Sequence, residues 1–125
     1  NDNPVFYIQY AHARISKVLE QWGGDISTLK LDDSFIFDSQ IELKLIKNIS
    51  IYPEIIIQAT NELAPHQIAN FLKDCAADLH SYYNDSKFLV EDEKIRVARL
   101  SLINSAKYVL KNGLGLLGIE APQQM

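Results

Sequence analysis

Two tyrosines and an arginine near the start of the sequence, Tyr7, Tyr10 and Arg14, recur at steps of three and four residues. On an α-helix this spacing places them on one face, which continues to Lys17. Phenol rings offer flat surfaces and hydroxyl groups, and a guanidinium offers a rigid fork of N–H donors for a phosphate or a base edge. Such a face suits a flat ligand. An aromatic pair at helical spacing also commonly packs over the edge of a core, so the pattern alone leaves both interpretations open.

No residue pattern predicts a catalytic or metal centre. His12, His66 and His80 are not at the spacing of metal ligands, and the single cysteine, Cys75, adds no Cys/His cluster. Because Cys75 falls among helical apolar positions, we expect its thiol to be buried. The residues therefore favour a binding module over an enzyme, with neither a metal nor a cofactor of its own.

Residues 113–118 (GLGLLG) match the G-x-G-x-x-G motif of dinucleotide-binding folds. That motif works as a turn between a strand and a helix in a βαβ unit. Here it follows a helical pattern instead of a strand. We therefore expect its glycines to end a helix and to let the tail pack closely.

Composition and charge are those of an ordinary globular domain. The 125 residues are 47% apolar and 22% charged, enough to enclose a single core. No apolar run approaches the roughly 20 residues that span a bilayer, and we expect a cytoplasmic protein with no membrane contact. The formal net charge is −4, which does not predict a broad electrostatic attraction to nucleic acid.

Basic residues are nevertheless concentrated in two segments that contain no acidic residue. Residues 4–19 hold Arg14 and Lys17, and residues 94–112 hold five basic side chains. These five are Lys94, Arg96, Arg99, Lys107 and Lys111. If the first and last helices pack side by side, a basic surface would form on an acidic body. Ordinary solvated helix faces would explain the same pattern.

Capping signals and apolar periodicity predict an all-α fold. We expect helices over about residues 4–22, 39–50, 54–62, 65–83 and 93–112. Asn3 caps the first helix and Gly23 ends it. Ser39 and Glu42 form a capping box for the second helix. Gly113 suits the left-handed residue that closes the last one.

Two longer loops are expected, over residues 25–38 and 84–92. The apolar side chains expected to anchor them are Leu31, Phe35 or Phe37 in the first loop and Phe88 and Leu89 in the second. No linker or repeat divides the chain. The expected fold is therefore a single domain over residues 1–125, an irregular all-α bundle of about five helices.

Three stretches resemble one known family. Residues 3–15 (NPVFYIQYAHARI) resemble the start of the C-terminal DALR anticodon-binding domain of arginyl-tRNA synthetases. Residues 63–72 (LAPHQIANFL) and the stretch from Arg96 through residues 109–119 (VLKNGLGLLGI) to Met125 resemble the same domain in the same order. The first motif is specific to the arginine enzyme. A DALR bundle in general would also suit another class I synthetase, such as the cysteinyl enzyme.

The resemblance implies that residues 1–125 are the C-terminal part of an enzyme that joins arginine to tRNA with ATP and Mg²⁺. The sequence has neither the His-x-Gly-His nor the Lys-Met-Ser-Lys signature of class I synthetases, so catalysis would belong to a catalytic domain of the same polypeptide. The partner implied for this domain is tRNA, namely the arginine acceptors. Their shared middle anticodon cytosine would be the base selected.

The resemblance also implies a set of anticodon-binding residues: Tyr7, Tyr10, Arg14 and Met125. Possible contacts with the RNA backbone are Arg96, Arg99, Lys107 and Lys111. Unpaired bases are typically read by aromatic faces, guanidinium planes and edge hydrogen bonds. The ending Pro122-Gln-Gln-Met departs from the commoner Pro-Glu-Arg-Met of the family and lacks its arginine. A different class of function, a helical protein-interaction module whose Tyr7/Tyr10 face meets a partner helix, is the alternative.

Overall fold

The computed structural model describes residues 3–125, which form five α-helices, one 3₁₀ turn and no strand. The elements are α1 (Pro4–Trp22), η1 (Ile26–Thr28), α2 (Gln40–Ser50), α3 (Tyr52–Asn61), α4 (Pro65–Asp85) and α5 (Glu93–Leu116). The predicted all-α fold is confirmed, and the predicted helix starts lie close to the observed ones.

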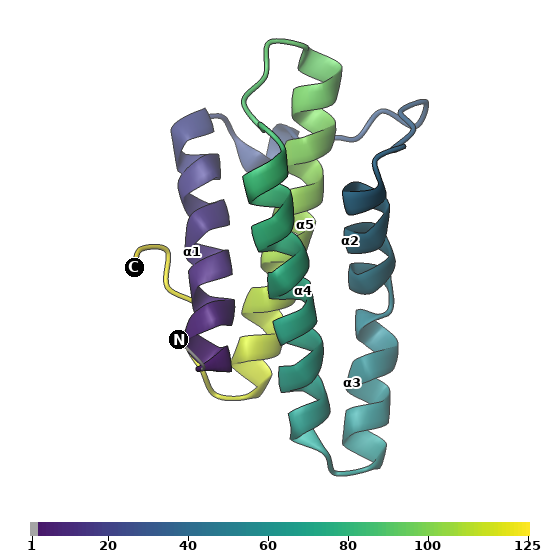
Figure 1. Cartoon of the computed structure of the whole chain (residues 1–125), viewed down its shortest axis with the longest axis vertical. Coiled ribbons are helices and arrows are strands. Elements are labelled where there is room, and N and C mark those ends of the chain that lie inside the picture. The colour runs from purple at the N-terminus through teal and green to yellow at the C-terminus, as the bar shows by residue number, and fades with distance from the viewer. Residues whose placement is uncertain (1–2) are drawn as a thin grey trace.

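Helices α4 and α5 form the centre of the bundle (Figure 1). Helix α1 packs against both from one side, whereas α2 and α3 follow one another along the other side. The largest apolar side chains with almost no solvent exposure are Ile8, Leu45, Leu72, Leu100, Ile103, Leu110 and Leu114. They come from α1, α2, α4 and α5, so a single core spans the bundle. One face of α1 packs into this core, and another face of α1 stays at the surface.

The helix starts follow the predicted capping signals, with one difference at α2. The Asn3 side chain accepts the backbone N–H groups of Val5 and Phe6 at α1, and the Ser39 hydroxyl accepts the N–H of Glu42 at α2. The side chain of Glu42 does not complete a capping box. It turns into the core, where its carboxylate accepts the hydroxyl of Tyr82 at 2.6 Å.

The predicted end of the last helix is wrong. Helix α5 continues to Leu116, and the left-handed glycine near the chain's end is Gly118, with φ of 73°. Continuing the helix carries Leu114, which is 0% exposed, into the core. Gly113 lies inside the helix, and a Cβ there would come within 2.7 Å of Leu72 Cδ2. This glycine therefore permits close packing of α5 on α4.

The loop anchors are partly as predicted. Phe37 packs against the core and contacts Phe35 edge-on, whereas Leu31 is exposed. Phe88 is buried, but Leu89 is exposed, so it does not anchor its loop. Within the described residues, no helix has both the length and the apolar character needed to cross a membrane.

Two glycines of α5 should respond in opposite ways to alanine. Gly113→Ala inserts a methyl group against the buried Leu72, at a cost of about 1–3 kcal/mol for overpacking, against a helix-propensity gain of about 1 kcal/mol. We expect a lower free energy of unfolding by about 1 kcal/mol. Gly115→Ala meets nothing within 4 Å and should stabilise the chain. Thermal melting of both variants tests this, and a stabilised Gly113→Ala would contradict the packing role.

Candidate functional site

A groove of about 680 Å³ lies between α1, the end of α4 and the C-terminal tail. Its lining residues are Tyr10, Ala13, Arg14, Lys17, Val18, Glu20, Gln21, Tyr83, Gln123, Gln124 and Met125. Three of the predicted site residues, Tyr10, Arg14 and Met125, therefore meet although they lie at opposite ends of the sequence. Tyr10 is 40% exposed and Met125 is 54% exposed, so both remain accessible to a ligand.

Two side chains of α1 bind the backbone of the tail and hold it along this groove. After Gly118, the tail turns back along α1 (Figure 1). The side-chain amide of Gln9 donates to the carbonyl oxygen of Glu120 at 3.0 Å, and Nδ1 of His12 contacts the carbonyl oxygen of Pro122 at 2.9 Å. Gln9 and His12 are one helical turn apart, so these two contacts fix the direction of the tail toward Met125.

His12 holds the tail as a neutral imidazole. A carbonyl oxygen can only accept, so the ring proton lies on Nδ1. The side chain is 1% exposed, and its Nε2 has no hydrogen-bond partner among the described residues. Burial lowers the pKa of His12, and the charges of Lys107 and Lys111 lower it further, against the hydrogen bond to Pro122, which raises it. These two lysines are thus close enough to His12 for their charges to act on its ring.

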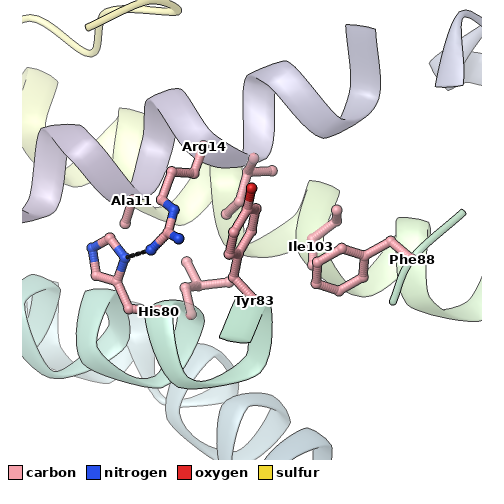
Figure 2. Close-up of a pocket in the computed structure, with 8 residues that line it drawn as sticks. Ala11, Arg14, His80, Tyr83, Phe88 and Ile103 are labelled. Atoms are coloured by element: carbon pink, nitrogen blue, oxygen red, sulfur yellow. Dashed lines mark hydrogen bonds between the residues drawn. The ribbon is translucent and has the colours of Figure 1, made fainter. Parts of the chain in front are cut away.

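The guanidinium of Arg14 is fixed between α1 and α4 (Figure 2). One terminal nitrogen contacts Nδ1 of His80 at 2.9 Å, and the other donates to the side-chain oxygen of Asn84 at 3.5 Å. Its central carbon lies 3.8 Å from the ring centroid of Tyr83 and 5.1 Å from that of Tyr10. Arg14 is thereby stacked on an aromatic ring at the wall of the groove, with further N–H groups left for a ligand.

Tyr7 contacts His80 and does not line the groove. The two ring centroids are 4.6 Å apart, and the carbonyl oxygen of Tyr7 lies 3.2 Å from Nε2 of His80. The ring of Tyr10 lies 5.4 Å from the same imidazole. Tyr7 thus packs at the edge of the core, as the spacing alone allowed, and its contact with a base stays a prediction.

The four residues predicted to contact the RNA backbone divide into two groups. Arg96 donates to the carbonyl oxygens of Val90 and Glu91, and Arg99 donates to that of Lys87 at 2.6 Å. These guanidinium groups hold the loop between α4 and α5. Lys107 and Lys111 lie instead near His12, where α5 packs against α1.

Sequence reasoning missed three side chains of α4 that contact Arg14, namely His80, Tyr83 and Asn84, of which Tyr83 also lines the groove. Their spacing of three and four residues places them on one helical face, which is a signal present in the sequence. What the sequence did not show is that this face meets Arg14. Within the described residues, no group of three or more His, Cys, Asp or Glu side chains is placed to hold a metal ion.

Comparisons with known proteins point to one family. The family model described as DALR anticodon binding domain matches residues 8–125. The arginine–tRNA ligase of Thiobacillus denitrificans is 46% identical over 125 residues, which are all of this chain and 22% of that protein.

Two solved structures share the fold. A Campylobacter jejuni protein described as an arginyl-tRNA synthetase has a TM-score of 0.85 at 30% identity, over 98% of this chain and 27% of its own. The Thermus thermophilus arginyl-tRNA synthetase has a TM-score of 0.80 at 34% identity, over 95% of this chain and 21% of its own. The chain thus spans about a fifth of the length of the curated relatives it matches.

The buried imidazole of His12 should make stability depend on pH. The pKa of His12 is lowered in the folded chain. As the pH falls below about 6.5, His12 is therefore protonated in the unfolded chain at a higher pH than in the folded chain. The free energy of unfolding should therefore fall between pH 7.5 and 5.5. His12→Asn keeps a donor for Pro122 but does not titrate, so the free energy of unfolding of this variant should fall less. Denaturant titrations at each pH measure both curves; parallel curves would show that His12 does not contribute.

Proposed function

The chain belongs to the family of DALR anticodon binding domains, and we propose on this basis that it binds the anticodon loop of arginine tRNA as part of an arginyl-tRNA synthetase. The relatives described above are arginine enzymes, which favours this enzyme over the cysteinyl alternative. ATP and Mg²⁺ would be used by the catalytic domain of the same polypeptide in the cytoplasm. This domain would contribute selection of the tRNA.

The observation that supports the proposal most directly is the gathering of Tyr10, Arg14 and Met125 around one groove. RNA sequence is read mainly where bases leave the stack and meet aromatic faces, guanidinium planes and edge donors. Tyr10 offers an exposed ring, on which a stacked base contributes about 1–3 kcal/mol. Arg14 offers fixed N–H donors for a base edge or a phosphate, and Met125 an adaptable apolar wall.

Lys17, Lys107 and Lys111 would contact the RNA backbone. Lys17 lines the groove, and Lys107 and Lys111 are close enough to the buried His12 for their charges to lower its pKa. Phosphate contacts position the RNA without reading its sequence. Arg96 and Arg99 already bind loop carbonyl oxygens, so they would reach RNA only through their remaining N–H groups.

Titration of the chain with two anticodon stem-loops tests the proposal. One stem-loop carries the middle cytosine of arginine acceptors, and the other carries uracil at that position. Because loss of a base-edge hydrogen bond to a charged group costs about 1.5–3 kcal/mol, we expect the cytosine form to bind about tenfold or more tightly. Equal affinity for both, or binding of neither, would count against anticodon selection and would favour the alternative of a protein-interaction module.

Single substitutions in the groove test the residues. Tyr10→Ala and Arg14→Ala should each weaken binding of the cytosine stem-loop by about fivefold or more. The change in thermal stability should be small compared with that of a core substitution, because Tyr10 is 40% exposed and Arg14 is only partly buried. Lys47→Ala is the matched control: it also removes one positive charge, but from an exposed site on α2, across the bundle from α1 (Figure 1). If Lys47→Ala weakens binding as much, the groove is not the contact surface.

A further inference from the structure

His80 lies behind the groove and contacts three of the side chains singled out in the sequence. Its ring faces those of Tyr7 and Tyr10, and its Nδ1 contacts Arg14. We infer that neutral His80 is a positioning residue, which holds the Arg14 guanidinium where it meets the RNA, and that a proton on His80 releases it. This inference rests on the proposed function.

Both ring nitrogens of His80 have assigned roles. A guanidinium can only donate, so Nδ1 must accept the N–H of Arg14 at 2.9 Å. The proton therefore lies on Nε2, which donates to the carbonyl oxygen of Tyr7 at 3.2 Å. His80 is 8% exposed and does not line the groove. It is placed to act on the ligand through Arg14 and not by contact.

Fixing Arg14 in advance should favour binding. An arginine side chain has many rotamers, and ordering it when a ligand arrives reduces affinity. Here the guanidinium is already held on the Tyr83 ring, 3.8 Å from its centroid, by hydrogen bonds to His80 and Asn84. Figure 2 shows this arrangement, with Arg14 between His80 and Tyr83. The remaining N–H groups of Arg14 therefore already point in a fixed direction before a ligand binds.

A proton on Nδ1 would reverse the contact. Nδ1 would become a donor opposite the donor of Arg14, and two positive charges would face each other. Within residues 3–125, the groups around this contact include no compensating carboxylate. Helix α1 supplies Tyr7, Tyr10 and Arg14, α4 supplies Tyr83 and Asn84, and α5 and the preceding loop supply the apolar Ile103 and Phe88. Burial lowers the pKa of His80, and the charge of Arg14 lowers it further, while the hydrogen bond to Tyr7 raises it.

Two variants separate the hydrogen bond from ring packing. His80→Phe keeps a ring beside Tyr7 and Tyr10 but removes the acceptor, whereas His80→Asn loses the ring but keeps an acceptor near the place of Nδ1. We expect His80→Phe to bind the cytosine stem-loop about three- to tenfold more weakly at pH 7.5, the effect of one hydrogen bond. His80→Asn should bind more tightly than His80→Phe. The opposite order would show that His80 only packs.

A double-mutant cycle tests whether His80 acts through Arg14. In the Arg14→Ala background, His80→Phe should change the affinity by less than about twofold, because the group that it positions is gone. Full additivity of the two effects would overturn the inference. Thermal melting of each variant shows whether it is folded; if His80→Phe does not fold, the pH comparison and the spectroscopy below still decide.

The pH dependence gives a second readout. Because burial lowers the pKa of His80, the pH is lowered from 7.5 until nitrogen NMR shows that the free chain's His80 has taken up its proton. Over that range the wild-type chain should lose affinity relative to His80→Asn at the same pH, by up to about the same three- to tenfold factor. Titration of His12 is common to both chains, so it cancels in this comparison. Parallel profiles would overturn the inference, as would a relative gain of wild-type affinity at low pH, which would mean that the new charge simply attracts phosphate.

Nitrogen NMR of the imidazole ring distinguishes failure of this inference from failure of the proposed function. The free chain should show the Nε2–H form of His80 at pH 7.5, and the side-chain N–H signals of Arg14 should shift as His80 titrates. An Nδ1–H form would overturn the inference whatever RNA does. If wild type distinguishes the two stem-loops but the His80 variants bind alike, only the inference fails; if wild type does not distinguish them, the proposed function fails and the inference falls with it.

Discussion

The apolar contact between α1 and α4 is the interaction on which the groove depends. Ala11 and Ile15 of α1 meet Leu79 of α4 and Ile103 of α5 directly beside Arg14. The small side chain of Ala11, 1% exposed, allows the two helices to approach closely. Because a close-packed core is rigid, it sets where the backbone of Arg14 lies along α4, and the polar contacts then orient its guanidinium. Those contacts then use an alignment that apolar packing has already fixed.

Helix α4 carries polar clusters on two sides, and burial separates their roles. Toward α2, Tyr82 is 0% exposed and donates to the buried carboxylate of Glu42, which lies 3.7 Å from Arg99 Nε. A buried network of this kind stabilises the packing of α2, α4 and α5. Toward α1, His80 is likewise buried, but its partner Arg14 extends into the groove. A neutral imidazole avoids the cost of burying a second charge there. The polar groups of both clusters are therefore hydrogen-bonded, and the cluster toward α1 is the one beside the groove.

The sequence predicts the helices well because most of their signals are local. Asn3, Pro4 and Gly23 define α1 through the geometry of their own backbone, without reference to any other helix. The end of α5 was not predictable in this way, since Gly113 looks like a helix end until Leu72 is known to lie against it. The same limit applies to the site. Helical spacing places Tyr7, Tyr10 and Arg14 on one face, but only the packed α4 shows that Tyr7 contacts His80 while Tyr10 faces the groove.

The longer α5 also explains how the tail reaches the groove. With the helix continued to Leu116 and the chain reversed at Gly118, only residues 119–125 remain to run along α1. At about 3.3 Å per extended residue, such a short segment has a limited reach. Contacts with Gln9 and His12 also fix it at two points within one helical turn. An end of α5 at residue 112 would have left a longer and less constrained tail. The core position of Leu114 thus determines, through the length of a helix, where Met125 meets Tyr10 and Arg14.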